Sequence, residues 1–131
     1  MNLLIDTQIL IWSLDVNSPL SRQHKEILEN TDNRILVSQV SLMELAIKKN
    51  INKLPEFVPT IPIIVDQLLM NGFELLNLTN DHISALLDIP LVAEHKDPFD
   101  RFLIAIAKNE KLPIMTTDIK FKLYSSFVDI V

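Results

Sequence analysis

MNLLIDTQILIWSLD (residues 1–15) shows how the chain is built. Within it, Leu3-Leu4-Ile5 is a continuous apolar run that ends at Asp6, as expected of a strand buried on both faces of a parallel sheet. A helical pattern over residues 8–14 follows directly. The same alternation recurs along the chain, which predicts an α/β domain with a mainly parallel sheet.

The rest of the chain supplies further strands and helices in turn. Strands are predicted at residues 34–37, 73–78 and 114–116, with a fifth candidate at 127–131. Helices are predicted at residues 20–29, 38–50, 62–71, 79–88 and 98–110. Gly72 should end the helix before it, and Asp97 should cap the helix that begins at Pro98.

Length and composition exclude several protein classes. A chain of 131 residues fits one domain with an ordinary core, so we expect residues 1–131 to form a single domain. Gly72 is the only glycine, which excludes the glycine-rich loops of P-loop, dinucleotide-binding and G-x-S-x-G esterase sites. Without cysteine there is no disulfide, thiol nucleophile or Cys-ligated zinc.

The charge and the N-terminus bear on location and partners. Asp6 interrupts the first apolar run and no basic region precedes it, which argues against a signal peptide. No uncharged apolar run reaches about 18 residues, so we expect a soluble, cytoplasmic protein without a membrane partner. The net charge of −5 argues against a partner held mainly by neutralised phosphates.

Acidic residues gather at one edge of the predicted sheet. In a right-handed strand–helix–strand layout, the carboxyl ends of strands and the N-termini of helices share an edge. Five acids fall there: Asp6, Glu44, Asp97, Asp100 and Asp118. Their repulsion, about 1 kcal/mol per pair at 4 Å even in water, indicates a cation. Oxygen ligands favour Mg²⁺ or Mn²⁺, which can activate water against a phosphodiester.

Each acid also has a purely structural interpretation. Asp6 and Asp97 suit helix N-caps, and Asp100 lies in a first helical turn, where the helix dipole favours an acid. Asp118 suits a turn. Glu44 could close a capping box, S-x-x-E, with the serine at position 41, unless the helix begins at a cap three residues earlier.

Four motifs together resemble a known family. They are LLIDT (residues 3–7), SLMEL (41–45), HKDPFDRFLIAIA (95–107) and TTD (116–118). In order and spacing they are similar to the PIN domain, and specifically to the VapC-like toxins of bacterial toxin–antitoxin pairs. The similarity spans essentially the whole chain, and DPFDRFLIAIA is its most specific part. It implies a three-layer α/β/α domain with a four- to five-stranded sheet.

The resemblance also implies an activity and its residues. The activity is a metal-dependent endoribonuclease that uses Mg²⁺ or Mn²⁺ to hydrolyse RNA. The implied metal ligands and catalytic acids are Asp6, Glu44, Asp100 and Asp118, with Asp97 as a further candidate ligand that we rank below Asp100. The implied or candidate substrate-binding residues are Thr7, Thr116, Arg101 and His95. Gln8 departs from the small polar residue or histidine often found after the first Asp–Thr pair.

The family also implies partners. They are the RNA substrate, a small antitoxin that covers the site, and a second copy of the chain in a homodimer. The apolar segment FVPTIPIIVDQLLM (residues 57–70) is a candidate antitoxin surface, although most of it also fits a core helix. Candidate RNA-binding cations near the acidic edge are Lys48, Lys49, Lys53, Lys96 and Arg101.

Two other functions compete with the ribonuclease. One is a non-catalytic PIN-like binding protein that retains its acids for a partner. The other is a phosphatase with Asp6 as the nucleophile. Haloacid-dehalogenase-type phosphatases place a second Asp two residues after the first, and here that position is Gln8, which counts against this reading.

Overall fold

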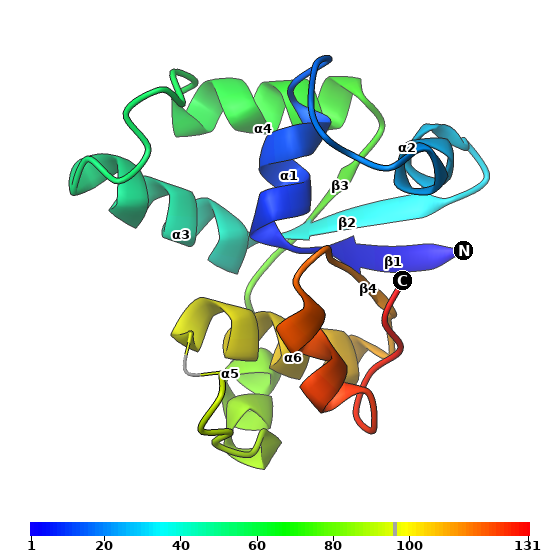
Figure 1. Ribbon diagram of the computed structural model, residues 1–131, viewed down its shortest axis with the longest axis vertical. Coiled ribbons are helices and arrows are strands. Elements are labelled where there is room, and N and C mark those ends of the chain that lie inside the picture. Colours follow the sequence, from blue (N-terminus) through cyan, green and yellow to red (C-terminus); the bar gives the residue numbers. More distant parts are fainter. Residues whose placement is uncertain (96) are drawn as a thin grey trace.

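The computed structural model describes residues 1–95 and 97–131, with a parallel sheet between two layers of helices (Figure 1). Its strands are β1 (Asn2–Ile5), β2 (Arg34–Ser38), β3 (Glu74–Leu76) and β4 (Ile114–Met115), in the order β3-β2-β1-β4. Each pairing between these strands is parallel. Ile5, the last residue of β1, pairs with Val37 on one side and Met115 on the other.

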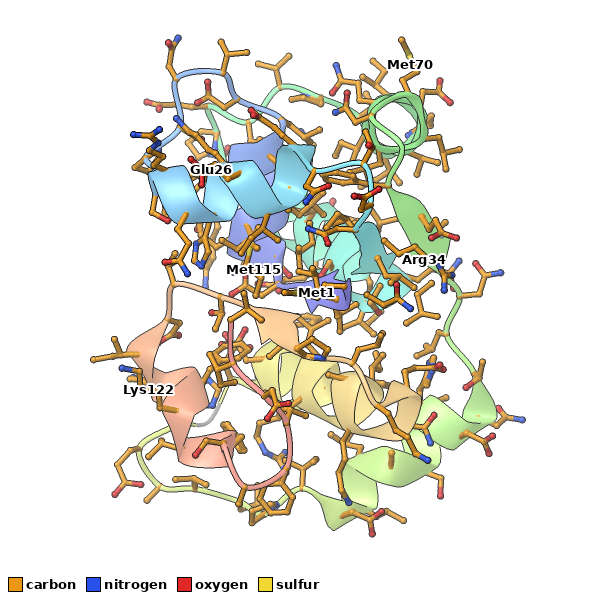
Figure 2. The ribbon with its side chains drawn as sticks, turned by 90° about the vertical axis from the view of Figure 1, so that its right-hand side faces the viewer. Met1, Glu26, Arg34, Met70, Met115 and Lys122 are labelled. Atoms are coloured by element: carbon orange, nitrogen blue, oxygen red, sulfur yellow. The ribbon has the colours of Figure 1, made fainter. Side chains whose placement is uncertain are left out.

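Helices cover both faces of the sheet. The α-helices are α1 (Thr7–Ser13), α2 (Arg22–Glu29), α3 (Gln39–Asn50), α4 (Ile61–Met70), α5 (Asn80–Ala85) and α6 (Pro98–Glu110). The 3-10 helices of the described residues are η1 (Leu86–Asp88) and η2 (Ile119–Tyr124). Figure 2 shows Glu26 of α2 and Met70 of α4 on one side of the sheet and Lys122 of η2 on the other. The predicted three-layer α/β/α arrangement is confirmed.

The two faces of β1 enter separate cores. Leu3 and Ile5 pack with residues of α1 and α4, whereas Leu4 packs with residues of α6 and η2. These three side chains are fully buried, and burial of a leucine or isoleucine contributes about 2 kcal/mol. Alternate side chains therefore anchor opposite helical layers, which holds the end of β1 firmly in place.

The strands differ from the prediction mainly in length. β3 and β4 are shorter than predicted, and Thr116 follows β4 instead of ending it. The predicted fifth strand at residues 127–131 is wrong, because only Ile130 forms a bridge to β4. The chain turns back just before it, with the Phe127 N–H donating to the Tyr124 carbonyl at 2.9 Å. The pairing of this segment with β4 is limited to Ile114, whose N–H donates to the Asp129 carbonyl and whose carbonyl accepts from the Val131 N–H, both at 2.9 Å.

The helices follow the prediction with local exceptions. The predicted helix at residues 79–88 changes from α5 to η1 after Ala85, and η2 was not predicted at all. Gly72 ends α4 as predicted, with a φ of +81° that favours glycine. Among the described residues, no helix has both the length and the apolar character required to cross a membrane.

Candidate functional site

Asp6 lies directly after β1 and caps α1. Its Oδ1 accepts a hydrogen bond from the Ile9 N–H at 2.8 Å, so its interpretation as a cap is confirmed. The side chain is nonetheless 4% exposed and lines a pocket, together with Thr7, which begins α1. A cap needs only one carboxylate oxygen, so the second remains for another role.

Glu44 enters the same pocket from the second turn of α3. The helix is capped by Ser38, whose Oγ accepts from the Val40 N–H at 3.0 Å. The capping box of Glu44 with Ser41 is therefore wrong. Glu44 is 3% exposed, and its Oε1 accepts from the Thr7 hydroxyl at 2.7 Å while its Oε2 pairs with Lys48.

Asp97 and Asp100 come from the start of α6. Asp97 is the N-cap, and its Oδ1 accepts from the N–H groups of Phe99 at 2.9 Å and Asp100 at 3.2 Å. Pro98 follows as the first helical residue, where its missing N–H costs nothing. Asp100 points to the same pocket, and its Oδ2 lies 3.0 Å from Nε2 of His95.

Asp118 completes the acidic group from beyond β4. It caps η2, with its Oδ1 accepting from the Lys120 N–H at 2.9 Å, so the turn interpretation is also correct. Its own N–H donates to the Thr116 hydroxyl at 3.0 Å. The sequence contained no recognised signal for η2, which holds this carboxylate at the rim of the pocket.

All five predicted acids line one pocket of about 310 Å³. They come from the ends of β1 and β4 and the N-terminal parts of α3 and α6, which Figure 1 shows meeting at one edge of the sheet. The other lining residues are Thr7, Gln8, Ile11, Lys48, Leu54, Thr117 and Phe121. The convergence predicted from strand and helix polarity is therefore present in the fold.

The pocket disfavours the ionised form of the Asp6 carboxyl. Burial raises the pKa of Asp6 to about 6; hydrogen bonds from Thr116 and Ile9 oppose this, and the charges of Glu44 and Asp118 add to it. These groups hold the Asp6 carboxyl in a site where a proton or another cation is favoured. Perturbed carboxyls in a shared pocket are typical of functional sites.

Asp100 shows the same effect. Burial raises its pKa to about 6, with the charges of Asp97 and Glu44 adding to the shift, whereas hydrogen bonding and charge from His95 lower it. Two carboxyls from different elements thus resist ionisation for the same reasons.

The donor set fits a divalent cation. Ligand atoms of His95, Asp100 and Asp118 all lie within 4.8 Å of one another, and Asp6 and Glu44 line the same pocket. Carboxylate oxygens with no thiolate are the ligands that Mg²⁺ and Mn²⁺ prefer. Of the two α6 acids, Asp100 is the better placed, because its carboxylate and not that of Asp97 belongs to this group of ligand atoms.

The predicted substrate-binding residues lie in different environments. Thr7 lines the pocket but donates its hydroxyl toward Glu44, and Thr116 is buried beside Asp6. Arg101 does not line the pocket, and its guanidinium donates to the Ile89 carbonyl at 2.8 Å. His95 is 3% exposed with both ring nitrogens in hydrogen bonds, so we no longer assign it or Arg101 to substrate.

The candidate RNA-binding lysines also lie in different environments. Lys48 lines the pocket, where it pairs with Glu44. Lys49 instead donates to the Phe57 carbonyl. Lys53 is exposed and does not line the pocket. Lys96 lies outside the described residues. The spacing of Glu44 and Lys48, four residues apart on a helix, was the signal that could have identified this pair.

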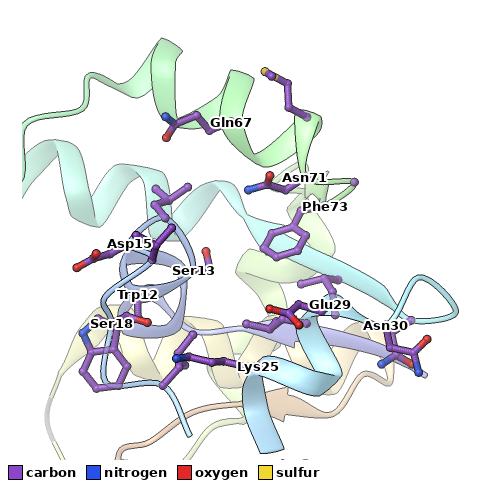
Figure 3. A pocket seen from close by; sticks show the side chains of 18 of the residues that line it. Trp12, Ser13, Asp15, Ser18, Lys25, Glu29, Asn30, Gln67, Asn71 and Phe73 are labelled. Carbon is purple, nitrogen blue, oxygen red and sulfur yellow. The ribbon is translucent and has the colours of Figure 1, made fainter. Parts of the chain in front are cut away.

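A larger cavity of about 740 Å³ lies away from the acids, between α1, α2 and α4 (Figure 3). Trp12, Lys25 and Phe73 are among the side chains around it. From residues 57–70, the predicted antitoxin surface, Gln67 and Met70 of α4 contribute to the lining. Elsewhere in that segment Ile64 and Leu68 belong to the core, as the alternative interpretation expected.

Comparisons with known proteins match this arrangement. Residues 3–125 match the PIN domain family. The fold is similar to a chain in the crystal structure of VapBC2 from Rickettsia felis bound to a DNA fragment from their promoter. The TM-score is 0.72 at 17% identity, covering 100% of this chain and 98% of that one.

Two further structures show the same fold at similarly low identity. A toxin–antitoxin complex from Klebsiella pneumoniae gives a TM-score of 0.57 at 21% identity, covering 98% of this chain and 95% of that one. VapBC-5 from Mycobacterium tuberculosis is a member of the VapBC family of toxin–antitoxin systems. Its structure gives a TM-score of 0.57 at 16% identity, covering 99% of this chain and 95% of that one. The comparison with curated proteins found no match.

Proposed function

Because the chain belongs to the PIN domain family, we propose that it is a VapC-like toxin that hydrolyses RNA phosphodiester bonds as a metal-dependent endoribonuclease. One observation carries the proposal: five carboxylates from four separate segments of the chain line a single pocket of about 310 Å³. Such a concentration of like charge is costly unless a cation balances it.

The proposed ligands for Mg²⁺ or Mn²⁺ are Asp6, Asp100 and Asp118, with Glu44 and Asp97 as further candidates. When bound, the ion supplies an activated water and stabilises charge on the phosphodiester. The protein contributes the geometry. Thr7 holds one oxygen of Glu44 at 2.7 Å, and the Thr116 hydroxyl bonds to Asp6.

Lys48 is proposed to meet the RNA backbone. Its ammonium group is partly exposed in the pocket, and its pKa is raised by the hydrogen bond and charge of Glu44 against the opposing effect of burial. A cation of this kind can approach a phosphate without the glycine loop that the sequence lacks. It would also help an acidic protein to hold RNA at this edge.

We also propose a small antitoxin partner and a homodimer. Support for the antitoxin comes from the solved relatives, which are themselves toxin–antitoxin complexes. Leu69 and Met70 of α4 are exposed, and Met70 lines the 740 Å³ cavity, which suits an apolar partner segment. Sedimentation of the chain with and without a co-expressed antitoxin tests both assemblies.

The direct test of the activity is RNA cleavage by the purified protein. We expect cleavage with Mg²⁺ or Mn²⁺, none with EDTA, and a loss of at least about a hundredfold in Asp6→Asn, because that change removes a proposed ligand charge. Glu26→Gln on exposed α2 is the matched control and should retain activity. Undiminished cleavage by Asp6→Asn would overturn the assignment.

The same samples separate the competing functions. A non-catalytic binding protein predicts that no divalent ion changes the melting temperature. A phosphatase predicts a trapped acyl-phosphate on Asp6, although Gln8 lines the pocket where such enzymes place their second Asp. Mapping the cleavage ends of cellular RNA, wild type beside Asp6→Asn, then identifies the RNA target.

A further inference from the structure

His95 forms a buried link between the acidic pocket and the helix η2. Its Nε2 lies 3.0 Å from Oδ2 of Asp100, and its Nδ1 lies 2.8 Å from the hydroxyl of Tyr124. Phe121 and Tyr124 pack around the imidazole with ring centroids 5.7 and 5.3 Å away. Tyr124 is fully buried, so the imidazole that packs against it cannot move without disturbing the core.

The hydrogen bonds define the tautomer of His95. The ionised carboxylate of Asp100 can only accept a hydrogen bond, so Nε2 of His95 carries the ring proton. Nδ1 is then the acceptor, and the Tyr124 O–H donates to it. That Nε2–H donates to the Asp100 carboxylate, so a neutral imidazole satisfies both neighbours.

We propose that His95 is a positioning residue, which fixes the carboxylate of Asp100 for a divalent ion, and that Tyr124 fixes His95 in turn. The inference rests on the proposed metal site but adds to it two residues, His95 and Tyr124, that do not line the pocket. A hydrogen bond to Oδ2 restricts rotation of the Asp100 carboxylate and leaves Oδ1 available for an ion in the pocket that Asp100 lines. Without it, repulsion from Asp97 and Glu44 would turn the carboxylate toward solvent.

Direct ligation by His95 is the competing arrangement. Its ligand atom lies within 4.8 Å of those of Asp100 and Asp118, which is close enough for a shared ion. Two observations favour positioning: His95 is not among the residues that line the pocket, and its Nε2 already has a partner in Asp100. A ligand role would require the ring to give up that bond.

The test is Mn²⁺ affinity, measured by electron paramagnetic resonance on the full chain. His95→Met keeps the size but loses the donor, and we expect binding about 10- to 100-fold weaker. His95→Gln can place an N–H near the former Nε2 and should bind within about threefold of wild type. Tyr124→Phe removes only the hydroxyl and should give a smaller loss, about threefold to tenfold.

His82→Gln is the matched control, since His82 is also fully buried but bonds to Glu110 at 2.6 Å and does not line the pocket. It should leave Mn²⁺ affinity unchanged.

Wild-type affinity in both His95→Met and Tyr124→Phe would overturn the inference, and Tyr124→Phe alone decides it if His95→Met does not fold. Coupling of a ¹⁴N nucleus to bound Mn²⁺ in wild type would also overturn it, in favour of direct ligation. A wild-type protein that binds no Mn²⁺ would instead overturn the proposed metal site itself.

Discussion

At the scale of single residues, Asp6 combines a structural and a chemical role. One oxygen caps α1, and the buried carboxyl also faces Glu44 and Asp118. From the sequence alone these two roles of Asp6 are alternatives, yet a carboxylate has enough acceptor sites for both. The cap in fact helps the chemistry, because it fixes the side chain at the edge of the pocket.

The raised pKa of Asp6 predicts a pH effect on the metal-free protein. Its pKa is about 6 in the fold against 3.8 for the free group, so the folded state binds this proton more tightly. The stabilising contribution is complete below about pH 4 and is lost as the pH rises through 6. Asp6→Asn should therefore become more stable relative to wild type over this range, by about 3 kcal/mol at most.

Urea unfolding in EDTA at several pH values between 4 and 8 measures this difference. Asp129→Asn, an exposed acid near the C-terminus, serves as the control and should show no comparable trend. A stability difference between Asp6→Asn and wild type that stays flat with pH would show that Asp6 ionises normally.

At the scale of elements, the start of α6 carries much of the site. Asp97 caps the helix, Pro98 begins it, and Asp100 in the first turn faces the pocket. The sequence DPFD therefore serves the helix and the pocket at once. Because a helix N-terminus carries partial positive charge, it also moderates the repulsion between these acids.

Two substitutions at Asp97 test its role as the N-cap of α6. Asp97→Asn keeps an oxygen acceptor for the N–H groups of Phe99 and Asp100 and should change stability little. Asp97→Ala loses the cap and should cost about 1 kcal/mol, seen as a melting temperature lower by roughly 4 °C. Thermal unfolding in EDTA measures this, and equal melting temperatures for the two variants would contradict the cap.

At the scale of the whole molecule, the fold places the polar ends of separate segments around one pocket. Two apolar cores on opposite faces of the sheet supply the stability that allows this concentration of charge. The remaining acids and bases lie mostly on the surface, where each costs little. The net charge of −5 is then partly the charge of the acidic pocket.

Divalent ions should therefore stabilise the folded chain. At a Mn²⁺ concentration one hundred times the dissociation constant, the gain is about 2.7 kcal/mol, which raises the melting temperature by roughly 10 °C. Differential scanning fluorimetry with Mn²⁺ against EDTA measures the shift, and Asp100→Asn should reduce it. The Glu26→Gln control should keep the full shift. An unchanged melting temperature in wild type would speak for a binding protein without metal.

The strand and helix pattern made much of the fold and site predictable. Short apolar runs such as Leu3–Ile5 and caps such as Asp97 are local signals, and helix polarity then places the acids on one edge. The 3-10 helix η2 was not predictable, since its residues have no periodicity that distinguishes them from a loop. The prediction of a fifth strand was wrong, because strand pairing depends on where the chain turns in the fold.

The sequence by itself determined the alternation of elements, the edge on which the five acids fall and the exclusion of glycine-loop and cysteine chemistry, because these follow from local pattern and composition. Only the tertiary structure decided which side chains meet. His95 contacts Asp100 and Tyr124, Arg101 donates to the Ile89 carbonyl and not into the pocket, and the Thr7 hydroxyl donates to Glu44. Contacts between separate segments depend on packing and burial, which no local pattern encodes.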